Sequence, residues 1–257
     1  MILSIIFFTF GALVGSFLNV LILRLPIEED VVFKSSHCPK CHKDISWYMN
    51  IPILSFIFLR GKCYYCKSRI SFQYPSVEIV SGIIAALIRP KYIDFDSLYF
   101  FFFYFSVFCV FLVHFIIDLR HKILPDSLNV YLFLTFAAYA FFYKTFMYAF
   151  LGFAVGLLFP LSVAYAFYKL KGVEGLGGGD IKLFAVLGIF LGPIGILQNL
   201  FLSCFLGSVI GILLILSKRF ERNEGIPFGP SILIVAGFQI YFPQIFERFT
   251  QFINFSF

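Results

Sequence analysis

The sequence has little charge for its length. Only 13% of its 257 residues are charged, while 60% are hydrophobic, and a soluble domain carries roughly 25% charged residues. A chain with so few charges cannot cover its surface with polar groups in water. This composition excludes an ordinary soluble protein and makes the bilayer the expected solvent.

Several patterns typical of hydrolases and exported proteins are missing as well. The four histidines form no HExxH pair, which argues against a zinc metalloprotease. No GxSxG segment is present, which weakens the case for a serine nucleophile. No Lys or Arg precedes the first apolar run and no small-residue cleavage site is obvious, so we expect a retained first transmembrane helix rather than a secretory signal.

Long apolar runs are what the sequence contains instead. A transmembrane helix needs roughly 20 apolar residues, and the candidates are residues 2–23, 76–90, 98–117, 127–143, 147–168, 183–197, 199–217 and 230–246. The run 76–90 is the weakest, because its apolar core is short and contains Glu78. A Gly192-Pro193-Ile194-Gly195 turn signal separates two of the later runs. The sequence predicts an all-α polytopic membrane protein with about eight transmembrane helices.

The basic residues predict the orientation of these helices. With the N-terminus outside, the inner loops hold 16 of the 20 Lys and Arg residues; these loops are 24–75, 118–126, 169–182 and 218–229. Cytoplasmic loops carry such an excess of positive charge. The net charge of +6 is therefore attributed to topology, and we expect membrane lipid and no nucleic acid as a partner.

Two C-x2-C pairs lie in the loop 24–75, separated by 21 residues, and consist of Cys38, Cys41, Cys63 and Cys66. Two short thiolate hooks at this spacing are typical of zinc ribbons. Disulfides and unligated thiols are the alternatives, and the reducing cytoplasm argues against disulfides. We predict a small cytoplasmic zinc-ribbon-like insert that gains on the order of 10 kcal/mol of folding energy from structural zinc.

These features divide the chain into three expected parts. Residues 1–23 form the first transmembrane helix, residues 24–75 the zinc-binding insert, and residues 76–257 a membrane-embedded helical core. A four-thiolate zinc site is closed and does not hydrolyse a substrate itself. Catalytic residues are therefore expected in the core.

Two aspartates of the core lie at the inner ends of predicted spans, Asp118 after the third and Asp180 before the sixth. A carboxylate at membrane depth costs roughly 2.5–3.5 kcal/mol, so its presence requires a reason. Two neighbouring carboxylates do not both ionise easily. The ionised one then takes a proton from water while the protonated one polarises a peptide carbonyl, which indicates aspartic peptidase chemistry.

Three glycines precede Asp180 and lack the side chains that would keep a substrate strand away from it. We assign substrate binding to Gly177, Gly178, Gly179 and Lys182. The alternative is that both aspartates are ordinary interfacial residues, solvated or paired with nearby Arg and Lys. A second alternative is a non-enzymatic transporter or assembly scaffold with a zinc-held cytoplasmic module, although the paired half-chain symmetry of many transporters is absent.

An ordered set of segments extends along most of the chain. It comprises residues 15–20, 24–26, the two cysteine pairs, 50–55, 60–63, 74–78, 118–126, the GxGDxK at 177–182, and 226–230. This set resembles the type IV prepilin peptidases, also called leader peptidase/N-methyltransferases. The resemblance implies that Asp118, which begins a D-x6-P-D segment, and Asp180, in GxGD, are the catalytic aspartates.

The same resemblance implies a substrate and a location. The family cleaves the short basic leader of prepilins and pseudopilins after a glycine, at the cytoplasmic face of the bacterial inner membrane. Many members then methylate the new N-terminal residue with S-adenosylmethionine. The sequence departs from the family at Met49, Gln73 and Arg120, and it has no glycine-rich strand-to-helix motif of a soluble methyltransferase. Methylation is therefore expected from the resemblance alone.

Overall fold

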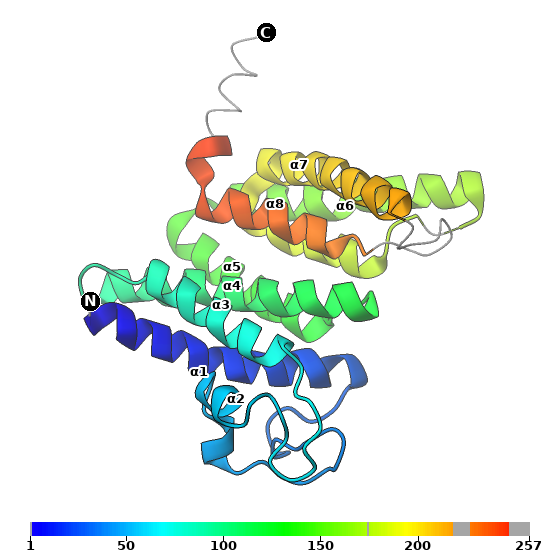
Figure 1. Cartoon of the computed structure of the whole chain (residues 1–257). Helices are drawn as coiled ribbons and strands as arrows, with labels where there is room; N and C mark the ends of the chain where they lie inside the picture. Colours follow the sequence, from blue (N-terminus) through cyan, green and yellow to red (C-terminus); the bar gives the residue numbers. More distant parts are fainter. Residues whose placement is uncertain (1, 174, 218–226, 247–257) are drawn as a thin grey trace. The chain divides into compact units, whose positions relative to one another are not determined.

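The computed structural model describes residues 2–173, 175–217 and 227–246 (Figure 1). Its elements are α1 (Ile2–Arg24), η1 (Leu25–Ile27), η2 (Trp47–Asn50), α2 (Leu54–Phe58), α3 (Gln73–Leu87), α4 (Phe95–His121), α5 (Asp126–Tyr143), α6 (Phe146–Lys171), α7 (Gly178–Leu216) and α8 (Gly229–Tyr241). Within the described ranges there is no β-strand, only two isolated β-bridges. The predicted all-α class is confirmed.

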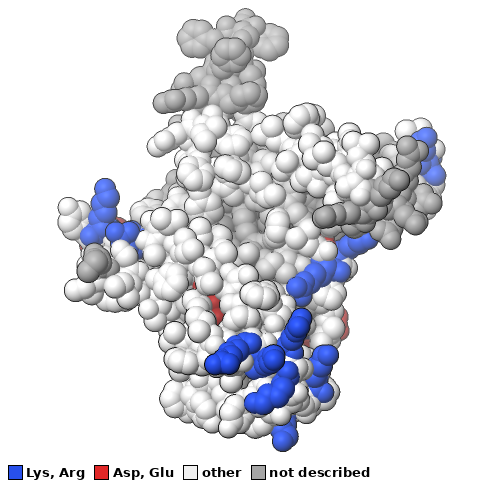
Figure 2. Space-filling view, in the orientation of Figure 1, with Lys and Arg blue, Asp and Glu red and all other residues white. Residues whose placement is uncertain are grey.

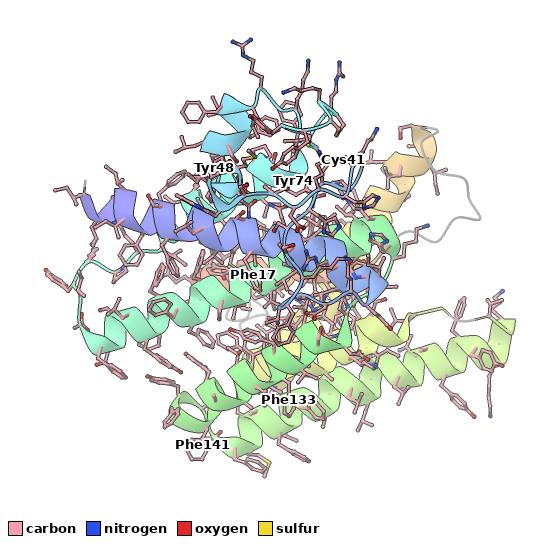
Figure 3. All side chains as sticks on the ribbon, turned by 90° about the horizontal axis from the view of Figure 1, so that it is seen from below. Phe17, Cys41, Tyr48, Tyr74, Phe133 and Phe141 are labelled. Carbon is pink, nitrogen blue, oxygen red and sulfur yellow. The ribbon has the colours of Figure 1, made fainter. Side chains whose placement is uncertain are left out.

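Four helical segments are long and apolar enough to cross a membrane, namely Ile2–Ile27, α4, α6 and α7. Large apolar side chains are also exposed on α5, where Phe133 and Phe141 are 40% and 82% exposed (Figure 3). Such exposure of large apolar rings is costly in water and ordinary in lipid. The helices α3, α5 and α8 are shorter or less apolar, so the count of eight spans remains a prediction.

The 39-residue helix α7 is kinked at Gly192, which has a non-helical backbone (φ 71°, ψ 179°) and precedes Pro193. A straight helix of that length would extend for about 58 Å, nearly twice the thickness of a bilayer core. Residues from both ends of α7, including Asp180 and Ile215, line a single cavity. The chain therefore turns back at the position where the sequence predicts a turn.

Glycines bring α6 and the first half of α7 into close contact. A Cβ atom on Gly152 would lie 2.0 Å from the Gly188 carbonyl oxygen, and one on Gly156 would lie 2.4 Å from the Phe184 oxygen. Small residues allow such backbone contact between membrane helices. At the kink, the Tyr148 hydroxyl donates to the Leu191 carbonyl (2.6 Å) and so satisfies a group that the break leaves without a helical partner.

The chain divides into two compact units, Met1–Val113 and His114–Phe257. In the first unit α1 packs on α3, where a Cβ atom on Gly15 would lie 2.8 Å from the Glu78 Cα atom. In the second unit α6, α7 and α8 pack together with α5. The predicted boundaries at 23/24 and 75/76 remain predictions.

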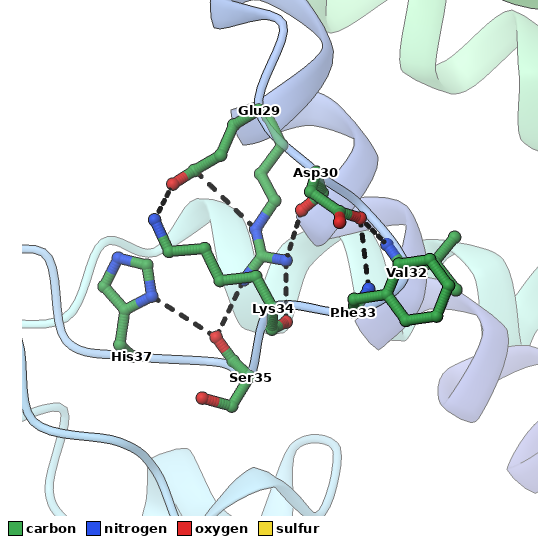
Figure 4. A network of polar contacts seen from close by, with 8 residues as sticks. Glu29, Asp30, Val32, Phe33, Lys34, Ser35 and His37 are labelled. Carbon is green, nitrogen blue, oxygen red and sulfur yellow. Dashed lines mark hydrogen bonds and ion pairs between the residues drawn. The ribbon is translucent and has the colours of Figure 1, made fainter.

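A buried arginine at the end of α1 holds the loop that follows this helix. The Arg24 guanidinium donates to the carbonyl oxygens of Asp30, Lys34 and Ser35, each at 2.9 Å (Figure 4). Its Nε atom lies 3.8 Å from a Glu29 carboxylate oxygen. Lys34 also pairs with Glu29, and this hydrogen bond lowers the pKa of that carboxyl. The first residues of the insert are therefore folded around one cation.

Candidate active site and candidate metal centre

Asp118 and Asp180 line one cavity of about 850 Å³ within the unit His114–Phe257. Asp118 lies in the last turn of α4 and is 5% exposed, whereas Asp180 lies in the first turn of α7 and is half-buried. Two acidic groups that the sequence separates by a long segment thus face the same space.

The N-terminus of α8 closes one side of Asp118. A Cβ atom on Gly229 would lie 2.6 Å from Asp118 Oδ2 and 3.1 Å from Asp118 Cγ. The Oδ2 atom is buried and has no hydrogen-bond partner among the described residues. A side chain at position 229 would overlap with the Asp118 carboxylate in its present position. Glycine avoids this overlap because it has no Cβ atom.

The three glycines before Asp180 differ in their surroundings. Gly177 lines the cavity, and a Cβ atom there would lie 3.1 Å from Asp180 Oδ2. A Cβ atom on Gly178 would meet nothing within 4 Å, while one on Gly179 would lie 3.2 Å from the Leu124 Cβ atom. The absence of a side chain on Gly177 thus leaves space directly beside the Asp180 carboxylate, Gly178 faces open space, and Gly179 serves close packing. Their contact with a substrate remains a prediction.

Lys182 has a partner outside the acidic pair. Its ammonium group lies 2.8 Å from both carboxylate oxygens of Asp126, and both side chains are largely exposed. The ion pair therefore links the first residue of α5 to the first turns of α7. Lys122, rather than Lys182, lines the cavity, and a substrate contact by Lys182 remains a prediction.

A buried polar cluster holds α8 against the second half of α7. The Asn199 amide donates to Gln239 Oε1 at 2.8 Å, and Gln239 donates to the Gly195 carbonyl at 2.8 Å. The Ser203 hydroxyl donates to Asn199 Oδ1 at 3.2 Å. Because unpaired polar groups are costly in an apolar interior, such a satisfied cluster fixes the register of two helices. It thereby fixes α8, whose first residue contacts Asp118.

Sequence reasoning missed three contributors to this site. Gly229 and Lys122 have already been described, and Leu124 lies within reach of both Gly179 and Gly229. Leu124 and Gly229 belong to segments that carry the family resemblance, so the segments were visible. Their contacts were not, because they depend on how α8 packs against the end of α4.

The four cysteines of the insert form one cluster. Their sulfur atoms all lie within 4.8 Å of one another, and the Sγ atoms of Cys38 and Cys66 are 3.9 Å apart. Tetrahedral zinc with Zn–S bonds of about 2.3 Å requires sulfur atoms about 3.8 Å apart. The hydrogen bond of Cys66 with the Ser68 side chain lowers the pKa of this thiol to about 6. The donor set therefore fits a soft divalent cation.

The two cysteine pairs have the same backbone conformation. The first cysteine of each pair accepts a hydrogen bond from the residue after the second cysteine, and that residue has a positive φ of 56° or 58°. The backbone hydrogen bonds of the first pair recur 25 residues later in the second pair. For example, the bond from His42 to Cys38 corresponds to the bond from Lys67 to Cys63. Isolated bridges, His37 with Asp44 and Lys62 with Arg69, stand where a ribbon would have strands. The structure thus has two matching knuckles, and the complete zinc ribbon remains a prediction.

The structure and the site together define a helical protein with membrane-spanning helices and two acidic groups in one cavity. Two family models match the chain, the bacterial peptidase A24 N-terminal domain over residues 9–92 and the type IV leader peptidase family over residues 103–212. The second range contains both Asp118 and Asp180. The chain belongs to the prepilin leader peptidase/N-methyltransferase family, which confirms the resemblance found in the sequence.

Curated relatives cover most of the chain. A prepilin leader peptidase/N-methyltransferase of Xanthomonas campestris pv. campestris is 35% identical, with 90% of this chain and 88% of the relative aligned. Proteins of the same name from Myxococcus xanthus and Bacillus subtilis are 37% and 33% identical, over 88% of this chain and 69% and 89% of those relatives. No solved structure matches the chain. These similarities favour the peptidase over the non-enzymatic scaffold.

Proposed function

We propose that this chain is a membrane aspartic endopeptidase that removes the N-terminal leader of type IV prepilins or pseudopilins and methylates the new N-terminal residue. The names of its relatives carry both activities. The observation that supports the peptidase activity most directly is the placement of Asp118 and Asp180 on one cavity. In this proposal these two residues are the catalytic pair.

The chemistry needs one ionised and one protonated carboxyl group. The ionised carboxylate takes a proton from a water molecule as its oxygen attacks the scissile carbonyl carbon, while the protonated carboxyl donates a hydrogen bond to the carbonyl oxygen. The tetrahedral species then collapses as the C–N bond breaks and the amine nitrogen receives a proton. The products are a leader with a new carboxyl group and a protein with a new amino group.

The glycine-lined edge of the cavity suits an extended substrate. Gly177 leaves space beside Asp180 and Gly178 faces open space, and backbone without side chains can approach a substrate strand closely. We assign these two glycines, together with Gly179, to substrate binding. For Lys182 we propose an indirect contribution as well, since its ion pair with Asp126 holds the segment that carries the glycines.

For the membrane topology we propose eight spans in the bacterial inner membrane, with the N-terminus outside. The four long apolar helices, the kink that divides α7 and the shorter apolar helix α8 all support a multi-pass chain. The charge distribution supports an inner location for the ends of α4 and α7 that carry the aspartates. The active site would then face the cytoplasm, where the leader lies.

For the insert we propose a structural zinc ion bound by the four cysteine thiolates Cys38, Cys41, Cys63 and Cys66. When bound, this ion would cross-link two knuckles that have few other core contacts, and it would take no part in hydrolysis. S-adenosylmethionine is the expected methyl donor. Its binding residues are not assigned, because the described residues contain no strand-to-helix loop of the kind that holds this cofactor in soluble methyltransferases.

Mass spectrometry of a co-expressed prepilin tests the proposal. The wild-type chain should convert the precursor to a product that lacks the leader and begins after a glycine. Methylation should add about 14 Da to that product, because a methyl group replaces one hydrogen atom of the new amino group. The variants Asp118→Asn and Asp180→Asn should leave the precursor intact while still inserting into the membrane. Substantial cleavage by either variant would reject the catalytic pair.

A further inference from the structure

The insert contains an apolar segment that is not buried. Residues 51–59 read Ile-Pro-Ile-Leu-Ser-Phe-Ile-Phe-Leu, with Ser55 as the one polar side chain. Leu54, Ile57 and Phe58, on the short helix α2, are 51%, 61% and 81% exposed. Exposed apolar surface of this kind marks an interaction site or a lipid contact.

A hydrogen bond gives the depth of this segment relative to a membrane helix. The backbone N–H of Ile53 donates to Glu78 Oε2 at 2.7 Å. Glu78 is buried and lies five residues after the start of α3, which corresponds to about 8 Å along the helix axis. Glu78 is also the third residue of the predicted span 76–90, so the turn that opens α2 lies at the start of that span.

The backbone at this attachment point is held in an uncommon conformation. Ile53 has φ 62° and ψ −50°, and a β-branched residue at positive φ costs on the order of 1–3 kcal/mol. The conformation persists because the surrounding structure fixes it, and the Glu78 carboxylate accepts the Ile53 N–H directly. The turn is thereby kept at the side of α3, with the α2 side chains directed outward.

Aromatic and basic residues flank the apolar segment. Trp47 and Tyr48, on η2, are 81% and 53% exposed, and η2 contacts α2. Figure 3 shows the place of Tyr48. Arg60 and Lys62 follow this segment, and both side chains are exposed. Residues 24–75 hold eight Lys and Arg against four Asp and Glu, and Figure 2 shows basic side chains gathered over this part of the chain.

This arrangement corresponds to that of an interfacial membrane element. Trp and Tyr are enriched at the headgroup level of bilayers, apolar faces of short helices enter the boundary between headgroups and acyl chains, and Lys and Arg attract the anionic lipids of the cytoplasmic leaflet. We propose that residues 47–59 form a lipid-docking segment, with α2 at the acyl-chain boundary of the bilayer and the basic residues after it among anionic headgroups.

Docking would add a third membrane attachment to a module that already has one at each end. In the proposed topology the insert leaves the membrane after α1 and returns at α3, and the segment attaches its middle as well. The knuckles with their cysteines would then be held at the membrane surface.

The single tryptophan of the chain provides a direct test, because Trp47 is the sole indole emitter. The full-length chain is placed in nanodiscs of phosphatidylcholine and phosphatidylglycerol, with or without bromine atoms on the acyl chains. Lipid docking predicts that brominated acyl chains remove about half or more of the Trp47 emission, since the indole lies at the interface. Aqueous iodide should remove much less. Quenching by iodide and not by bromolipid would overturn the proposal.

Two phenylalanines of the insert supply a matched pair of variants. Phe58 lies in the segment and Phe33 outside it, and they are 81% and 90% exposed. Phe58→Glu should reduce the bromolipid quenching at least about twofold, because a carboxylate resists entry into the acyl region, whereas Phe33→Glu should leave it unchanged. Equal effects of the two variants would contradict a docking role for α2. If neither bromolipid nor iodide quenched the emission of the wild-type chain, protein would cover the segment. That result would also overturn the docking proposal.

Discussion

The insert and the cavity-bearing core use their reactive side chains in opposite ways. In the insert the four thiols form one cluster between two knuckles, with Cys38 and Cys63 buried, Cys66 exposed and little apolar packing. In the core the carboxyl groups lie on the wall of a cavity that close packing of helices has already formed. Loss of a thiol should therefore undo local structure, whereas loss of a carboxyl group should remove chemistry and leave structure.

The largest effect is expected from the two aspartates. Asp118→Asn and Asp180→Asn should each lower the rate of leader cleavage by roughly 10³-fold or more, and the double variant should be no worse than either single one, since the pair acts as one unit. Rates are measured on a purified prepilin in detergent or nanodiscs. The exposed Asp96 gives the matched control Asp96→Asn, which should cleave normally. Additive losses in the double variant would contradict a shared role.

A smaller loss is expected where α8 touches Asp118. Gly229→Ala places a methyl group within 2.6 Å of Asp118 Oδ2 and displaces the carboxylate, and misplacement of a catalytic group by about 1 Å can cost about 100-fold. Cleavage should fall by about 10- to 100-fold while thermal unfolding changes little. Gly237→Ala on the same helix meets nothing within 4 Å and should retain activity. Equal activity of the two variants would show that Asp118 does not depend on its glycine neighbour.

The polar cluster between α7 and α8 should have a still smaller influence. Asn199→Leu leaves Gln239 Oε1 without its donor in a buried position, which costs about 1–3 kcal/mol. We expect a lower thermal midpoint, which recovers in part when Gln239→Leu is added. Ser162→Ala removes an exposed hydroxyl that bonds within its own helix and serves as the control. A double variant that is worse than Asn199→Leu alone would argue against a mispaired amide as the cause.

The smallest effect on cleavage is expected from the cysteines. Cys63→Ser with Cys66→Ser should abolish stoichiometric zinc, measured by elemental analysis, and make the insert sensitive to limited proteolysis. Leader cleavage should stay within about threefold of wild type, because none of the four thiols lines the cavity and independent sites contribute separately. Cys204→Ser should leave the zinc content unchanged. A loss of cleavage as large as that of Asp118→Asn would break the contrast between the two regions.

The sequence was sufficient to predict what depends on local pattern. Apolar runs gave the all-helical class, and the spacing of Cys38, Cys41, Cys63 and Cys66 predicted their cluster. The predicted topology put Asp118 and Asp180 at the same face, and the structure has both on one cavity. Gly192 was recognisable as a turn because glycine and proline together interrupt a helix in any context.

Other features depend on partners that are distant in the chain. The attraction of Lys182 to Asp126 and the fit of Gly229 against Asp118 arise only when α5, α7 and α8 have packed. The Asn199–Gln239 bond joins residues 40 positions apart, and no periodicity signals it. The apolar run 51–59 was visible in the sequence, but its position beside α3 rests on the bond between Ile53 and Glu78.

The turn at Gly192 has a consequence for the size of what the cavity can admit. Asp180 and Phe184 on one side of the cavity and Gly211 and Ile215 on the other belong to the two arms of a single helix. The second arm is about 36 Å long, so a rotation of about 3° at the glycine shifts its far end by about 2 Å. A change in the backbone torsion of Gly192 would therefore change the distance between the two arms of α7. That distance limits the width of a polypeptide that can enter the cavity, although Gly192 is remote from the bond that is cut.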